Sequence, residues 1–219
     1  MKLTPQSWIW RHTVAQPGWL SRCSDGPVVW LAWLTDAPDI ESRLFSLLSS
    51  DEWARHARFQ QREDGRRFLV GRGLLRILAG AHLGIAPAEV QFGYGLHGKP
   101  FIRGFAGSFQ FNVSHSGDLV LLAFHSNREV GVDVEQVRPT AELANLAREM
   151  FSGREYTRWC GLAAGEQVET FYRAWTRHEA AVKAVGTGLA GGRGYSEGAQ
   201  AWLELALPEG YAGYVCCSS

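Results

Sequence analysis

Apolar residues along the chain form two kinds of run: short continuous ones, typical of buried strands, and longer ones with helical spacing. The strand-like runs are Val28–Leu34, Leu119–Phe124, Ala201–Leu207 and Tyr211–Cys217. The last two flank Pro208-Glu209-Gly210, which predicts a terminal hairpin. Phe109–Ser116 leads through Gly117-Asp118 into Leu119–Phe124 and predicts another hairpin, with a polar cluster at its end.

The helical runs alternate with these strands. They cover Ile40–Leu48, a segment starting near Trp53, Phe68–Leu83, Thr140–Phe151 and Gln167–Val185. Ser152 and Glu155 have the spacing of a capping box, and Gly186 ends the last helix. Each half of the chain offers strands and a long helix, so the pattern allows two similar α+β halves joined near residues 125–130.

Length and composition are those of a soluble globular protein. The chain has 219 residues, 46% of them hydrophobic, and a formal net charge of zero, so bulk nucleic acid or an anionic membrane is not an expected partner. Met1–Gly18 contains no apolar core of signal-peptide length. Cys23, Cys160, Cys216 and Cys217 lack metal-ligand or disulfide spacing, so we expect a reducing cytoplasm.

Two carboxylates share one face of the short strand predicted at Gly131–Glu135. Side chains alternate along a strand, so Asp133 and Glu135 point the same way, while Val132 and Val134 point into the protein. Paired carboxylates repel each other and lose hydration on burial, which favours a divalent cation between them. The alternative is an edge strand with a solvated acidic face, and the strand by itself does not decide.

The longest helix adds a third acid and a lysine. Trp175, Glu179 and Lys183 are four residues apart and share one face, although a surface Glu–Lys pair explains this equally well. Together with Asp133 and Glu135, Glu179 would suit Mg²⁺, and Lys183 can neutralise a leaving phosphate. This chemistry indicates Mg²⁺-dependent attack on a phosphate ester or pyrophosphate without identifying the substrate.

Arginines are concentrated between residues 55 and 76. They are Arg55, Arg58, Arg62, Arg66, Arg67, Arg72 and Arg76. A solvated helix face is the simpler interpretation, yet an anion site that binds phosphate is also consistent with the cluster. Lys99 is one of few lysines and lies in a glycine-rich turn, and His115 lies beside serines near a hairpin tip.

Four segments together resemble 4′-phosphopantetheinyl transferases. They are Gly98-Lys99-Pro100, Phe111–Ser116 (FNVSHS), Gly131–Glu135 (GVDVE) and Trp175–Lys183 (WTRHEAAVK). Each is weak alone, but their order, spacing and the chain length are specific. The resemblance covers residues from about 30 to 190 and is to the Sfp type, which acts on carrier proteins of peptide and polyketide synthesis.

The resemblance implies an α+β fold in which two similar α/β halves, here residues 1–127 and 128–219, form a pseudo-dimer around coenzyme A. The implied reaction transfers the 4′-phosphopantetheine arm of coenzyme A to a serine of an acyl, peptidyl or aryl carrier protein and releases adenosine 3′,5′-bisphosphate. Mg²⁺ is the implied cofactor. We expect a monomer with no nucleic-acid or membrane partner.

The resemblance also implies roles for single residues. Asp133, Glu135 and Glu179 would hold Mg²⁺ against the pyrophosphate, Lys183 would assist the leaving group, and His115 would bind the 3′-phosphate. Asp133, Glu179 and Lys183 form the expected catalytic set. Further expected coenzyme A contacts are Gly98, Lys99, Pro100, Asn112 and Ser114, besides Asp133 and Lys183.

One departure concerns the helix motif, where the family usually has lysine before the glutamate and this chain has His178. A neutral imidazole would leave a cation missing, but we expect Mg²⁺ and Lys183 to suffice for activity. The basic contacts of the first half are also not matched by lysine. Arg55, Arg62 or Arg67 are candidates to replace them.

Several questions stay open at the level of sequence. The base that deprotonates the carrier serine is Glu179, a metal-bound water or Glu155, and for Glu155 the capping box is a sufficient explanation. A different Mg²⁺-dependent phosphoryl- or pyrophosphate-cleaving enzyme is one alternative function. A non-catalytic homologue that binds coenzyme A or a carrier protein is another. The carrier, the pathway and the acceptance of acyl-coenzyme A are not determined.

Overall fold

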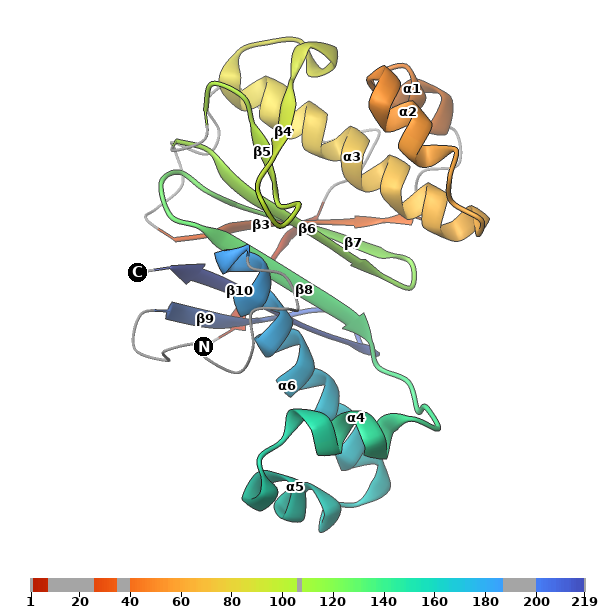
Figure 1. Ribbon diagram of the computed structural model, residues 1–219, viewed down its shortest axis with the longest axis vertical. Coiled ribbons are helices and arrows are strands. Elements are labelled where there is room, and N and C mark those ends of the chain that lie inside the picture. The colour runs from red at the N-terminus through yellow and green to blue at the C-terminus, as the bar shows by residue number, and fades with distance from the viewer. Residues whose placement is uncertain (1, 8–25, 35–39, 106–107, 187–199, 219) are drawn as a thin grey trace.

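The computed structural model describes residues 2–7, 26–34, 40–105, 108–186 and 200–218. Figure 1 shows two sheets in the middle of the molecule, with helices at both ends of its long axis. Cys23 and most of Met1–Gly18 lie outside the described residues. No described helix is long and apolar enough to cross a membrane.

The two larger sheets have four strands each. In spatial order the first contains β2 (Gln6–Ser7), β3 (Val28–Trp33), β7 (Leu119–His125) and β6 (Gln110–Ser116). The second contains β1 (Lys2–Leu3), β9 (Gln200–Leu205), β10 (Tyr211–Ser218) and β8 (Val130–Gln136). A separate hairpin is made by β4 (Phe92–Tyr94) and β5 (Pro100–Ile102). The predicted strands and both predicted hairpins are confirmed.

The helices match the predicted runs in order, with different ends. They are α1 (Glu41–Phe45), α2 (Ser50–His56), α3 (Arg62–Leu83), α4 (Leu143–Met150), α5 (Gly153–Cys160) and α6 (Ala164–Val185). The start of α3 at Arg62 precedes the prediction, because its first turn carries the acidic residues Glu63 and Asp64 and its first buried apolar side chain is Phe68. Acidic side chains stabilise a helix N-terminus, but they leave no hydrophobic periodicity to detect.

Apolar side chains of the first sheet face two different cores. In β3, Val28, Trp30 and Ala32 pack in the core with α3, whereas Val29 and Leu31 pack in the core with the second sheet. Every residue of β7 is buried, which explains its continuous apolar run. The layers are therefore α3, the first sheet, the second sheet and α6.

Helix α6 lies very close to strand β8. At Gly131 a Cβ atom would collide with the backbone of Ala180 and Ala184, so only glycine permits this approach. The contact places the helix face that carries Glu179 beside the strand that carries Asp133. Strand β8 thus has α6 on one face and the apolar core between the sheets on the other.

The first strand of the chain belongs to the sheet of the second half. Lys2 lies opposite Glu204 and Leu3 opposite Leu205 in a parallel pairing of β1 with β9. The N-terminal segment therefore ties the two halves together. The division of the chain at residues 127 and 128 stays a prediction.

Candidate active site

Asp133 is the most deeply buried acid of the site, with 3% of its surface exposed. The Ser114 hydroxyl of β6 donates to Asp133 Oδ1 at 2.9 Å, and Lys183 Nζ of α6 donates to the same oxygen at 2.5 Å. Desolvation raises the pKa of the Asp133 carboxyl, although the lysine opposes this shift. The second oxygen, Oδ2, is buried and has no hydrogen-bond partner among the described residues.

Glu135 and Glu179 are both half-buried and both feel the charge of Asp133. Burial raises the pKa of each carboxyl, and the charge of Asp133 raises it further. The Ser116 hydroxyl donates to Glu135 Oε2 at 2.7 Å. Glu179 Oε1 is buried without a hydrogen-bond partner in the described part of the chain.

This donor set fits a hard divalent cation. Within the described residues, no three acidic, histidine or cysteine side chains are close enough together to form a complete metal-binding group. However, Asp133 Oδ2 and Glu179 Oε1 are buried anionic oxygens without a hydrogen-bond partner in the described segments. Such burial costs free energy unless a cation or a donor binds these oxygens. The assignment of Asp133, Glu135 and Glu179 to Mg²⁺ stays a prediction, and these two atoms support it.

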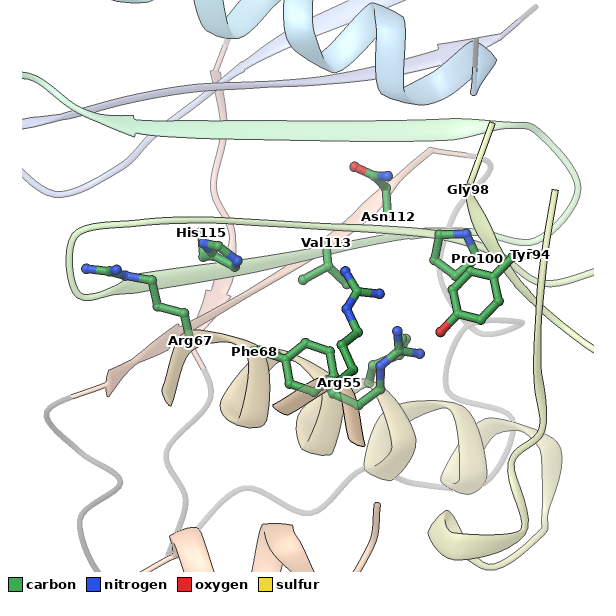
Figure 2. A pocket seen from close by; sticks show the side chains of 12 residues that line it. Arg55, Arg67, Phe68, Tyr94, Gly98, Pro100, Asn112, Val113 and His115 are labelled. Carbon is green, nitrogen blue, oxygen red and sulfur yellow. The ribbon is translucent and has the colours of Figure 1, made fainter. Parts of the chain in front are cut away.

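A cationic pocket of about 200 Å³ lies between α3 and β6. Arg55, Arg67, Arg72 and His115 contribute its basic side chains, and Figure 2 shows Arg67 and His115 together at one end of it. Partial burial lowers the pKa of the His115 imidazole, and the charge of Arg67 lowers it further. Arg62, the third candidate arginine, lines a different groove.

Arg72 was not singled out by the sequence pattern, yet it is the most buried cation of this pocket. Its side chain is 7% exposed, its Nη1 is buried without a partner among the described residues, and its guanidinium lies 4.3 Å from the Phe92 ring centroid. Its Nε is 3.4 Å from Glu52, which Arg76 already contacts at 2.8 Å. The single carboxylate of Glu52 therefore pairs with two arginines, so this group of three side chains carries a net positive charge at the pocket wall.

Lys99 has protein partners in place of an open position. Its ammonium donates to Glu129 Oε2 at 2.5 Å, to the Ala184 carbonyl at 2.6 Å and to the Val130 carbonyl at 3.3 Å. Its stem also lies against Gly186, whose φ of 72° ends α6. Lys99 therefore joins the β4–β5 turn to the start of β8 and the end of α6. Its contact with coenzyme A stays a prediction.

Gly98, Pro100 and Asn112 lie between the cationic pocket and a second pocket that Glu179 lines. The second pocket, of about 380 Å³, is lined by these three residues together with Glu179 and Lys183. The same three residues line the cationic pocket. The three residues predicted from the sequence to contact coenzyme A therefore form a wall shared by two neighbouring pockets.

Glu155 and His178 are two further residues that the sequence analysis discussed, and both lie on helices. Glu155 Oε2 accepts the Ser152 N–H at 2.9 Å, which confirms this contact of the capping box, and hydrogen bonds from Ser152 lower the Glu155 pKa. His178 is exposed and precedes Glu179, whose pKa its charge lowers. Glu155 thus has a structural role in α5 that needs no catalytic explanation.

Comparison with known proteins finds a matching family for both the N-terminal and the C-terminal part of the chain. Residues 32–127 match the family described as 4′-phosphopantetheinyl transferase, N-terminal, and residues 129–205 match the 4′-phosphopantetheinyl transferase superfamily. The chain is 40% identical over 184 residues to the 4′-phosphopantetheinyl transferase HetI of Nostoc sp., covering 82% of this chain and 77% of HetI. It is 31% identical over 147 residues to 4′-phosphopantetheinyl transferase Sfp of Bacillus subtilis, covering 67% and 64% of the two chains. The chain therefore belongs to the 4′-phosphopantetheinyl transferase superfamily of enzymes.

Proposed function

We propose that the chain transfers the 4′-phosphopantetheine moiety of coenzyme A to a serine of an acyl or peptidyl carrier protein, in a Mg²⁺-dependent reaction that releases adenosine 3′,5′-bisphosphate. The observation that carries the proposal is the wall formed by Gly98, Pro100 and Asn112. This wall lies between the cationic pocket and a second pocket, which is lined by Glu179 and Lys183, and Lys183 in turn contacts Asp133. A nucleotide with a terminal phosphate and an internal pyrophosphate needs both environments side by side.

The acids and the lysine would act on the pyrophosphate. Asp133, Glu135 and Glu179 would hold Mg²⁺, which when bound supplies a Lewis acid for phosphate oxygens. Lys183 Nζ donates to Asp133 and to Ser114, so the third N–H of its ammonium would neutralise charge on the leaving bisphosphate. Because Lys183 shares the second pocket with Gly98, this charge would lie next to the nucleotide.

The cationic pocket would hold the nucleotide end. His115 would bind the 3′-phosphate, with Arg67 beside it, and Arg55 and Arg72 would add further donors. Arg72 Nη1 is buried and has no acceptor within the described part of the chain, so an anion would gain a charge-assisted hydrogen bond there. The pocket would thereby fix the pyrophosphate at the acids.

The transfer step forms one bond and breaks one. The carrier serine Oγ bonds to the phosphorus that bears the pantetheine arm, and the pyrophosphate P–O bond breaks as the bisphosphate departs. The serine proton passes to a base. Burial raises the pKa of Glu179, whereas hydrogen bonds lower that of Glu155, so Glu179 is the stronger base of the two.

A mass-shift assay tests the proposal. The chain would be incubated with coenzyme A, Mg²⁺ and a panel of acyl, peptidyl and aryl carrier proteins, and the carriers measured by intact-protein mass spectrometry. We expect at least one carrier to gain the phosphopantetheine mass, with no gain when Mg²⁺ is chelated. Cleavage of coenzyme A without a mass gain would instead indicate a different pyrophosphate-cleaving enzyme. Tight binding with neither outcome would indicate a non-catalytic homologue.

A further inference from the structure

Strands β6 and β8 are held together by side chains where a continuous sheet would use backbone pairing. Each is the last strand of its own sheet, and they run next to each other. Three polar residues of β6 accept backbone N–H groups of β8: Asn112 from Val132 at 3.0 Å, Ser114 from Val134 at 3.3 Å and Ser116 from Gln136 at 3.0 Å. Each bond joins residues twenty positions apart, so the three form a regular side-chain ladder.

The ladder determines where each serine proton points. A hydroxyl has one proton to donate and two lone pairs that accept. Ser114 Oγ accepts from the Val134 amide and from Lys183 Nζ at 3.1 Å, so its proton is left for Asp133 Oδ1 at 2.9 Å. Ser116 Oγ likewise accepts from the Gln136 amide and donates to Glu135 Oε2 at 2.7 Å.

Each serine therefore occupies one oxygen of an acid on the neighbouring strand. The acid cannot turn that oxygen elsewhere without losing a charge-assisted hydrogen bond, which leaves its other oxygen directed away from the serine. In Asp133 this other oxygen is Oδ2, the buried atom without a partner among the described residues. Partners of metal ligands commonly orient them in this way.

We propose that Ser116 is a positioning residue, which holds Oε2 of the Glu135 carboxylate so that the other oxygen, Oε1, is directed to a divalent cation. The inference rests on the proposed function, in which Glu135 helps to hold Mg²⁺. Ser114 makes the corresponding contact with Asp133, but it also touches Lys183, so its replacement would disturb several contacts at once. Ser116 contacts only Glu135 and the β8 backbone in the described hydrogen-bond network, which makes it the cleaner test.

The experiment measures Mn²⁺ binding to the protein directly, by electron paramagnetic resonance, without coenzyme A or a carrier. Ser116→Ala should weaken Mn²⁺ binding about tenfold, in the range typical for partners of metal ligands. Ser116→Thr keeps the hydroxyl and should restore it to within about twofold of wild type. Thr140→Ala is the matched control, since the Thr140 hydroxyl also accepts a hydrogen bond from a backbone amide, that of Glu142, and has no described hydrogen bond to Asp133, Glu135 or Glu179.

A double variant separates positioning from general weakening of the fold. If Ser116 acts through Glu135, then Ser116→Ala should cost less than about twofold when Glu135→Gln is already present. The same double-variant comparison applies to the apparent Mg²⁺ requirement of the transfer assay. Circular dichroism melts would report any common loss of structure.

The outcomes distinguish this inference from the function on which it rests. Two results overturn the positioning role and leave the proposed metal site intact. In the first, the wild-type protein binds Mn²⁺ and Ser116→Ala binds it equally well. In the second, Ser116→Ala weakens Mn²⁺ binding by the same factor whether or not Glu135→Gln is present. If the wild-type protein does not bind Mn²⁺ while chelation still abolishes transfer, the inference that Ser116 prepares a metal site in the substrate-free protein is overturned. The proposed reaction is unaffected by that result. A weakening that Ser116→Thr rescues supports the positioning role.

Discussion

Lys183 Nζ contacts only one oxygen of the Asp133 carboxylate, Oδ1, and the other oxygen stays without a partner among the described residues. The lysine side chain is 30% exposed, whereas that of Asp133 is 4% exposed. The ion pair therefore compensates a buried negative charge through Oδ1 alone, which leaves Oδ2 available for the proposed metal. This relationship leads to two predictions about stability and activity.

Lys183→Met should destabilise the protein by about 2 kcal/mol near pH 8, because it leaves Asp133 ionised and uncompensated. Desolvation already raises the Asp133 pKa, so protonation at lower pH relieves the penalty. The destabilisation is therefore full above the folded-state pKa of Asp133 and shrinks as pH falls through it. Urea unfolding at pH 5 and pH 8 measures this, with Lys183→Met/Asp133→Asn as the control that removes the charge. Equal stability of Lys183→Met and wild type at pH 8 would contradict the prediction.

Asp133→Ala should reduce phosphopantetheine transfer at least ~1,000-fold while the fold is retained, because it removes a proposed metal ligand and the partner of Lys183. Asp133→Asn keeps the acceptor for Ser114 and serves as a second variant of nearly native shape. Transfer rates come from the mass-shift assay and the fold from circular dichroism. Substantial activity in both variants would place the reacting centre elsewhere.

Coenzyme A binding should tighten as pH falls if His115 contacts the 3′-phosphate. Partial burial holds the His115 pKa below its ordinary value in the free protein, and a bound phosphate would raise it. Binding then takes up a proton, so affinity is lost as pH rises through the pKa of the complex and is constant below that of the free protein. Calorimetric titrations at several pH values test this against His115→Gln. A pH profile identical in the two proteins would remove the histidine from the phosphate site.

Arg72→Met should weaken coenzyme A binding about tenfold without lowering the melting temperature. Arg76 keeps its contact with Glu52 Oε2, so the Glu52 carboxylate retains a cationic partner, although Oε1 loses its 3.4 Å contact with Arg72. The substitution also eliminates a desolvated guanidinium, which offsets that loss. Arg62→Met is the matched control, because Arg62 is on the same helix and outside this pocket. If both variants bind coenzyme A equally well, Arg72 has no role in the site.

His178→Lys should increase coenzyme A affinity by about two- to threefold, since a permanent cation beside Glu179 would lie near the phosphates. The effect should be small because His178 is exposed and solvent screens its charge. The same titration at low and high salt measures both the gain and its screening. Unchanged binding in His178→Lys would mean that the departure from the family motif has no electrostatic consequence.

The sequence by itself determined the order of the longer helices and strands and showed which two carboxylates share a face of β8, but it predicted neither β1 nor β2. Strand β8 was predicted because valines alternate with Asp133 and Glu135, and α6 because apolar residues recur at helical spacing. Both patterns are formed by residues that are close together in the sequence, so they can be detected without the structure. The family resemblance came from four short motifs for the same reason.

Only the tertiary structure decided how these elements share their contacts. Three such contacts join residues that are far apart in the chain: Lys183 with one oxygen of Asp133, Arg72 with the carboxylate of Glu52, and the ammonium of Lys99 with the carbonyl of Ala184. The side-chain ladder between β6 and β8 depends on two edge strands that meet in one register, and no local sequence pattern encodes that register. Periodicity reports which face a side chain occupies, whereas the packing of sheets and helices selects its partner, and in this protein that partner determines what each polar group can do.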